Sequence, residues 1–212
     1  MKKLLFYSLF LISTPVVFAQ NTLENMGVLI PKELKEWEFT KDHLDGQQLF
    51  KNAEGVKAFI TQRNEPVKIY QFYKYHPESN IELIPNVTFY IFPNLLPIGD
   101  YPNMVTDFFV KNRQGLSNVK NITNETFLNG NVPEYVQHYN YKEQVMINKK
   151  RTDVNVNMVQ ALIFKPEYIL FIDAYQPIEP KYDSPKIYNE REKEELVKMI
   201  KEIKIKETVI IE

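Results

Sequence analysis

The chain has 212 residues, of which 44% are hydrophobic, with 26 basic and 27 acidic side chains and no Cys. This apolar fraction, together with a net charge of -1, excludes an intrinsically disordered chain. The balanced charge also argues against a nucleic-acid partner, because proteins that bind nucleic acids carry a basic patch. The absence of Cys excludes disulfides, thiolate metal sites and thiol nucleophiles.

The first residues have the layout of a cleaved secretory signal. Lys2 and Lys3 form a positive n-region, residues 4–18 form an apolar h-region, and Val17 and Ala19 place small residues before the cleavage point. The apolar run is shorter than the ~20 residues that a membrane-spanning helix needs. We therefore expect cleavage after Ala19, no stable membrane insertion afterwards, and a periplasmic or secreted location. A bacterial lipoprotein would need Cys at the cleavage point, so lipid anchoring is excluded.

The rest of the chain is predicted to form one domain. Residues 1–19 are the signal peptide, residues 20–30 are interpreted as a short tether, and residues 31–212 as a single α+β domain, since no linker or repeat divides them. Apolar and polar residues alternate with a period of two, which predicts strands. These strands are expected over residues 35–41, 55–62, 67–75 and 87–92, followed by an antiparallel hairpin over residues 154–176.

Two helices are predicted between these strands. The first begins near Pro102 and ends at Gly115, with an apolar stripe on one side. The second begins at Asn189 and is followed by an alternating segment that predicts a short final strand. Antiparallel strands with helices set aside favour an α+β fold over a parallel one.

The order of these elements, rather than a chemical motif, points to a family. An early strand bearing Trp37 leads to paired strands and to a helix that ends in Gly115 and Leu116. The turn at residues 129–131, a strand at 135–141, the long hairpin and the C-terminal helix follow. This order resembles the Mog1/PsbP fold family, including its secreted bacterial DcrB-like members. The resemblance implies an antiparallel β-sheet sandwich with helices packed on it and a small non-catalytic module that binds or assembles protein complexes.

Residues that carry catalytic chemistry are few and scattered. No Ser lies in a G-x-S-x-G motif, and no Gly-rich phosphate loop is present. The three His residues are far apart and lack metal-ligand spacing: His43, His76 and His138. We therefore expect no cofactor and no bound metal, and we favour a protein that is not an enzyme.

A local polar cluster and one acid within a strand need separate interpretations. Asp42, His43 and Asp45 form the densest polar cluster, and a polar hairpin closed by Asp45 and Gly46 explains it. Asp173 lies inside an apolar strand, where it is expected to share a face with Ile169, Phe171 and Tyr175. An acid in that place is either a general base with a shifted pKa or a strand acid that is exposed or paired with Tyr or Lys.

Aromatic residues are in excess, with 13 Tyr, 14 Phe and 1 Trp. Rows of Tyr suit a surface that meets a partner, although strands favour aromatic residues in any case. Residues 93–102 contain three Pro, which make the loop rigid. A rigid loop with apolar tips loses little entropy on binding. The alternative is that these tips pack under the sheet. We predict a contact site made of this loop and neighbouring Tyr rows: Leu95, Leu96, Ile98, Tyr101, Tyr73 and Tyr75.

The sequence therefore favours an exported, non-enzymatic binding or assembly module. Its aromatic strands and the loop at residues 93–102 are expected to contact a protein or an envelope component. One alternative is a hydrolase that acts on cell-wall or glycan material with carboxylates dispersed in the sequence. Another is a carrier of a small apolar ligand, with an internal cavity lined by Phe89, Phe92, Phe164 and Phe171.

Overall fold

The computed structural model describes seven stretches of the chain: residues 22–41, 67–75, 83–94, 101–129, 132–147, 149–178 and 190–206. The predicted signal peptide lies outside these residues, as do the predicted strand at 55–62 and the cluster of Asp42, His43 and Asp45.

Most of the described strands form one seven-stranded sheet. In spatial order they are β2 (Glu38–Lys41), β3 (Lys68–Tyr73), β4 (Asn86–Pro93), β8 (Tyr168–Ile178), β7 (Lys150–Phe164), β6 (Val132–Ile147) and β5 (Ser117–Asn129). Every neighbouring pair is antiparallel. The predicted hairpin at 154–176 is confirmed as β7 and β8, and the α+β class is confirmed in its coarse form.

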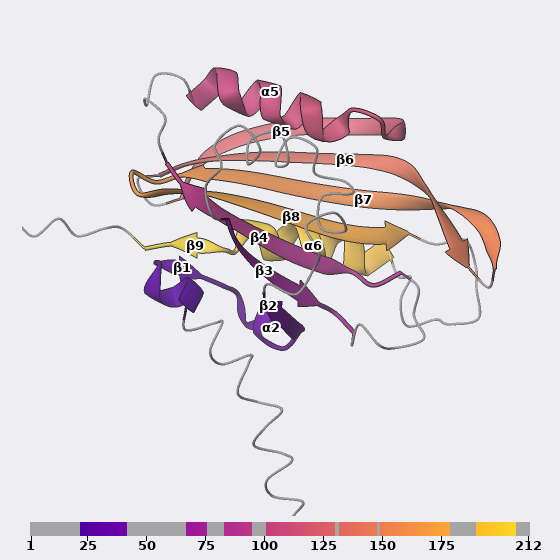
Figure 1. Ribbon diagram of the computed structural model, residues 1–212, viewed down its shortest axis with the longest axis horizontal. Coiled ribbons are helices and arrows are strands. Elements are labelled where there is room, and N and C mark those ends of the chain that lie inside the picture. The colour runs from indigo at the N-terminus through magenta and orange to yellow at the C-terminus, as the bar shows by residue number, and fades with distance from the viewer. Residues whose placement is uncertain are drawn as a thin grey trace, which may run out of the picture.

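Helices cover both faces of this sheet (Figure 1). Helix α5 (Tyr101–Arg113) lies on one face, and helix α6 (Glu190–Lys201) and the short helix α2 (Lys32–Lys35) lie on the other. We call these the α5 face and the α6 face. The sandwich is therefore formed by helices around one sheet rather than by two stacked sheets.

Strand β8 shows why both faces need a cover. Its residues Leu170 and Ile172 belong to the apolar cluster of the α6 face, whereas Ile169 and Phe171 belong to the cluster beneath α5. All four side chains are fully buried. Alternate side chains of a strand point to opposite faces, so a strand that is apolar on both sides has to lie in the middle of the fold.

Helix α5 follows the prediction closely. Its apolar stripe buries Val105, Phe108 and Phe109 against the sheet. The chain leaves the helix through Gly115, whose φ of +83° is a left-handed conformation that Gly adopts without steric cost. Leu116 then packs against the cluster that contains Tyr139 and Tyr141.

Strand β5 is an addition to the predicted order of elements. Most of its side chains are exposed, and Leu128 is 70% exposed. It is the edge strand of the sheet and pairs with β6 on one side only. Because it buries little, it lacks the apolar alternation by which a strand is recognised in a sequence.

Residues 22–30 are not a tether, which corrects the predicted domain boundaries. Leu23 and Val28 are fully buried in the core of the α6 face. Strand β1 (Val28–Leu29) pairs antiparallel with β9 (Lys204–Ile205), the predicted final strand. The Tyr168 hydroxyl also donates to the Met26 carbonyl oxygen over 2.9 Å. This segment is therefore part of the folded unit.

Asn129 connects the C-terminal strand to the main sheet. Its amide nitrogen donates to Glu134 Oε2 over 2.6 Å and to the Ile203 carbonyl oxygen over 2.8 Å. Its Oδ1 accepts from the Ile205 backbone nitrogen over 3.0 Å. Glu134 is fully buried, and burial raises the pKa of its carboxyl to about 7, although the hydrogen bond from Asn129 and the charge of Lys204 both lower it.

Replacing this amide tests how far the C-terminal strand depends on it. We expect Asn129→Ala to lower the free energy of unfolding by about 2 to 3 kcal/mol, because buried partners would lose their hydrogen bonds. Denaturant unfolding measures this change. The exposed Asn155→Ala is the matched control, expected to change stability by less than about 0.5 kcal/mol. Equal effects of the two substitutions would contradict the assignment.

Candidate functional site

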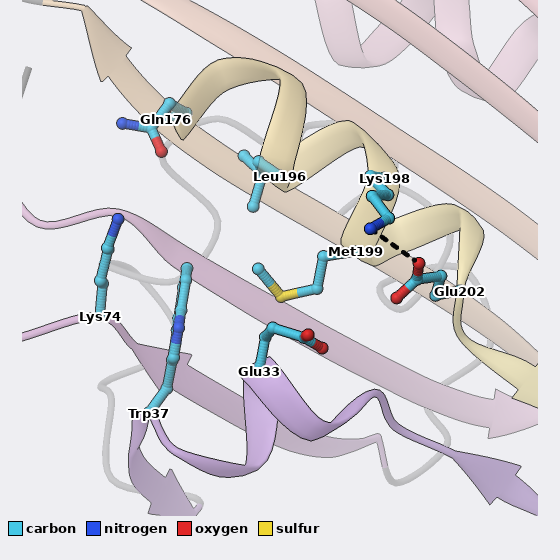
Figure 2. Close-up of a pocket in the computed structure, with 8 residues that line it drawn as sticks. All are labelled: Glu33, Trp37, Lys74, Gln176, Leu196, Lys198, Met199 and Glu202. Carbon is cyan, nitrogen blue, oxygen red and sulfur yellow. Dashed lines mark ion pairs between the residues drawn. The ribbon is translucent and has the colours of Figure 1, made fainter. Parts of the chain in front are cut away.

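A pocket of about 330 Å³ opens between α2 and α6 on the α6 face (Figure 2). We call it the α2–α6 pocket. Residues from four separate parts of the chain line it: Glu33, Trp37, Lys74, Gln176, Leu196, Lys198, Met199 and Glu202.

The apolar wall of the pocket comes from α6 and from the residue that follows α2. Leu196 and Met199 lie three residues apart on one side of α6 and are almost fully buried. Trp37 is half-buried and packs against the same core cluster. Its backbone nitrogen donates to the Leu34 carbonyl oxygen over 3.2 Å, and Leu34 anchors α2 in the core. The indole is thereby held at the pocket while part of its surface stays open.

Four charged side chains surround this wall. Glu33 comes from α2, Lys74 follows β3, Lys198 comes from α6, and Glu202 directly follows α6. In Figure 2 the Lys74 side chain runs beside Trp37, and Glu33 extends toward Met199. Lys198 and Glu202 form an ion pair at 3.5 Å, but both are well exposed, so this pair contributes little stability. The pocket therefore offers an apolar wall with an equal number of acidic and basic groups around it.

A row of polar side chains crosses the α5 face of the sheet. Thr88, Asp173, Gln160, Gln137 and Asn124 are register partners on five adjacent strands. The row separates the apolar cluster beneath α5 from the cluster that contains Tyr139 and Tyr141. Polar groups at such a place need hydrogen bonds, because burying them without partners is costly.

Asp173 is the titratable member of this row. Its Oδ1 accepts a hydrogen bond from Gln160 Nε2 over 3.0 Å. Burial raises the pKa of the Asp173 carboxyl to about 7, and the hydrogen bond from Gln160 opposes that rise. Burial and, next, the charge of Asp173 raise the pKa of the Tyr90 and Tyr139 hydroxyls, which stay protonated. The predicted face of Asp173 is confirmed, but its hydrogen-bond partner is a Gln rather than a Tyr or Lys.

Among the described residues, the two carboxyl groups whose pKa is raised to about 7 lie on opposite faces of the sheet. Asp173 lies on the α5 face, whereas Glu134 lies on the α6 face near β9. A glycosidase needs its two carboxyl groups within roughly 10 Å of each other, on either side of the same bond. In the part of the chain that the structure describes, no group of three or more His, Asp or Glu residues is placed to hold a metal ion.

Tyr73 and Tyr101, two residues of the predicted contact site, lie at opposite ends of β4. Tyr73 lies opposite Asn86 at one end of β4, and its hydroxyl donates to Gln71 Oε1 over 2.6 Å. Tyr101 lies near the other end of β4, where its oxygen accepts from Asn94 over 2.7 Å. Tyr101 is only 8% exposed, and its ring stacks on Phe164 at 4.3 Å between centroids. Tyr101 therefore packs within the core, while Tyr75 is half-buried.

The tips of the predicted binding loop, Leu95, Leu96 and Ile98, lie outside the described residues. A binding role for them stays a prediction.

The aromatic strands mainly build the core. Their buried members include Tyr70, Phe89, Tyr90, Phe92, Tyr139 and Tyr141. The predicted carrier cavity is wrong in its stated form, because Phe89 lies on the α6 face and the other three rings lie on the α5 face. Phe92, Phe164 and Phe171 are packed in the cluster beneath α5, where Phe171 meets Phe108 at 4.8 Å.

No family model, curated protein or solved structure matches the chain. None of the described helices is long and apolar enough to cross a membrane.

The raised pKa of Asp173 predicts how stability depends on pH. The folded carboxyl has a pKa of about 7, above the value of about 4 in an unfolded chain. The folded state therefore binds this proton more tightly, and its contribution to stability is lost as the pH rises from about 4 to about 7.

We expect Asp173→Asn to be more stable than the wild type at pH 8 by about 2 to 4 kcal/mol, since each pH unit between the two pKa values corresponds to about 1.4 kcal/mol. At pH 4 the two proteins should be about equally stable. Denaturant unfolding from pH 4 to pH 8 measures the difference. The exposed Asp153→Asn serves as control, and a similar pH profile for both variants would refute the burial of Asp173.

Proposed function

We propose that the protein is an exported, non-enzymatic binding or assembly module whose α2–α6 pocket receives an apolar side chain of a protein or envelope partner. The half-open Trp37 beside Leu196 and Met199 carries this proposal. Trp is among the residues that contribute most to binding energy when a partner excludes water from it. The predicted signal peptide supports export to the periplasm or the exterior.

The charged groups around the pocket support a protein-like partner. Apolar centres with a polar rim are typical of protein–protein interfaces. Glu33 and Glu202 can accept hydrogen bonds from a bound segment, and Lys74 and Lys198 can donate them. An extended or helical segment with one apolar anchor and polar neighbours fits this arrangement.

The architecture also supports the finer fold assignment, which we propose together with the function. Helices lie on both faces of one antiparallel sheet, and the strand pairs, α5, the long hairpin and α6 follow in the expected order. We propose on this basis a Mog1/PsbP-like fold, similar to secreted DcrB-like proteins. Such a fold is consistent with binding and assembly rather than catalysis.

Site-specific cross-linking tests the pocket. A photo-reactive p-benzoylphenylalanine in place of Lys198, at the pocket rim, should yield adducts with a partner in native envelope extract. The same group in place of Lys111, an exposed position on α5, is the matched control. We expect Trp37→Ala to reduce the residue 198 adducts at least tenfold, because the partner's apolar side chain would lose its contact with the indole.

Thermal unfolding of the Trp37→Ala variant checks that it remains folded. If adducts at position 198 persist unchanged in the folded variant, the proposal that the α2–α6 pocket binds the partner is contradicted. Adducts that form equally at residues 198 and 111 would do so too.

A hydrolase acting on glycan material is the second candidate, and one observation favours it. Glu33, on α2, and Glu202, which directly follows α6, line the same pocket (Figure 2). Two carboxyl groups facing one cavity are what glycoside hydrolysis requires.

The binding proposal predicts that the wild-type protein releases no reducing ends from purified cell-wall glycan. The hydrolase candidate predicts release that falls at least ~100-fold in Glu33→Gln and in Glu202→Gln, since each would act as acid, base or nucleophile. The exposed Glu167→Gln is the control. Turnover that depends on Glu33 and Glu202 would show that the protein is a glycan hydrolase and would contradict the binding proposal.

A further inference from the structure

A second pocket, of about 290 Å³, lies on the opposite face of the sheet, between α5 and strands β5 and β6. We call it the α5 groove. It runs along one side of the helix, whose lining residues Val105, Phe109 and Arg113 repeat every four positions. The facing wall includes Tyr135 and Gln137 from β6. The groove shares no residue with the α2–α6 pocket.

The two ends of the groove differ in polarity. At the start of α5, Tyr101 and Tyr135 both pack on Phe164, at 4.3 and 5.8 Å between ring centroids, so this end is apolar. At the end of α5, the charge of Arg113 reaches Tyr139, where it lowers the pKa that burial raises. Gln137 is the neighbour of Tyr139 on the same face of β6, which places Arg113 and Gln137 at the polar end.

Gln137 lines this groove and carries a buried hydrogen-bond acceptor. Its side chain is 1% exposed, and its Nε2 donates to Asn124 Oδ1 over 2.8 Å. This bond fixes the amide, so the carbonyl oxygen Oε1 is the atom left to accept. Oε1 is buried and has no hydrogen-bond partner within the described stretches of the chain. Buried acceptors in native proteins are nearly always satisfied by protein, water or ligand.

Arg113 supplies a positive charge to the same groove. Among the described residues it forms no ion pair with an acid. The carboxylate of Glu125, which also lines the groove, is bound instead to Lys201 at 2.7 Å. The guanidinium is therefore available to a ligand anion, and its planar fork matches a carboxylate.

We propose that the α5 groove binds a small amphipathic carboxylate that carries an N–H or O–H donor next to the carboxylate, the chemistry of an N-acyl amino acid. Arg113 holds the carboxylate, Gln137 Oε1 accepts from the donor, and the acyl chain lies along Phe109 and Val105 toward Tyr135. The volume restricts the ligand to a small molecule. This site is independent of the proposed partner pocket on the other face.

Three matched ligands test this chemistry on the wild-type protein. N-hexanoylglycine has the carboxylate, the amide N–H and the acyl chain. Octanoate lacks the N–H, and N-hexanoylglycinamide lacks the charge. In titrations followed by amide NMR we expect saturable shifts at Arg113, Gln137 and Thr106 with N-hexanoylglycine, and at least tenfold weaker binding of the other two. No saturable shift at 10 mM, or equal binding of octanoate or the amide, would overturn the proposal.

Substitutions in the groove provide the second test. We expect Arg113→Gln and Gln137→Met each to weaken N-hexanoylglycine binding at least tenfold, whereas the exposed Arg151→Gln leaves it unchanged. Unchanged binding to folded Arg113→Gln would contradict the assigned carboxylate site. The comparison of the three ligands uses only wild-type protein, so it remains decisive if a variant does not fold.

Discussion

Burial of the central strands on both faces is the constraint on which the rest of this structure depends. Strands β4, β7 and β8 carry apolar side chains on both sides, so helices have to cover the sheet from above and below. Seven strands spaced about 4.8 Å apart span about 29 Å, whereas one helix is only about 10 Å wide. The α6 face is covered by α6 and α2 and the α5 face by α5, and each pocket lies beside one of these helices. The candidate binding sites follow from the way the core is closed.

The polar row on the α5 face is the main exception to this apolar burial. It lies between two apolar clusters and brings Asp173 close enough to influence the pKa of several buried Tyr hydroxyls. The row also ends at Gln137 and Asn124, which line the α5 groove. The groove is thus the place where the interior polar row meets the surface.

Much of the fold could be predicted because its strands and helices bury enough apolar surface to leave a periodic pattern. The hairpin of β7 and β8, helix α5 and strand β4 all belong to this class. Strand β5 could not be predicted, since an exposed edge strand has no apolar alternation. The burial of residues 22–30 was missed because β1 pairs with β9, at the far end of the sequence, and no local pattern reveals such a pairing.

The candidate sites were less predictable than the fold. The sequence predicts Trp37 on a strand, which is wrong, because Trp37 lies between α2 and β2. Its pocket partners Leu196 and Met199 come from a helix near the C-terminus. The face of Asp173 followed from strand periodicity, whereas its pairing with Gln160 depends on the register of β7 and β8. The rows of Tyr and Phe were correctly assigned to strands, yet most of their rings build the core and leave little surface for a partner. Periodicity determines which side chains share a face, and only tertiary structure determines which of them meet.

Occupation of the α2–α6 pocket can be observed directly, because Trp37 is the only Trp in the chain. Protein labelled with 5-fluorotryptophan has one ¹⁹F NMR signal, which remains visible in an unlabelled envelope extract. If a partner covers the indole, this signal shifts or broadens when native extract is added and recovers when excess unlabelled protein competes. A signal that stays unchanged under conditions that yield cross-links at residue 198 would show that the partner binds elsewhere.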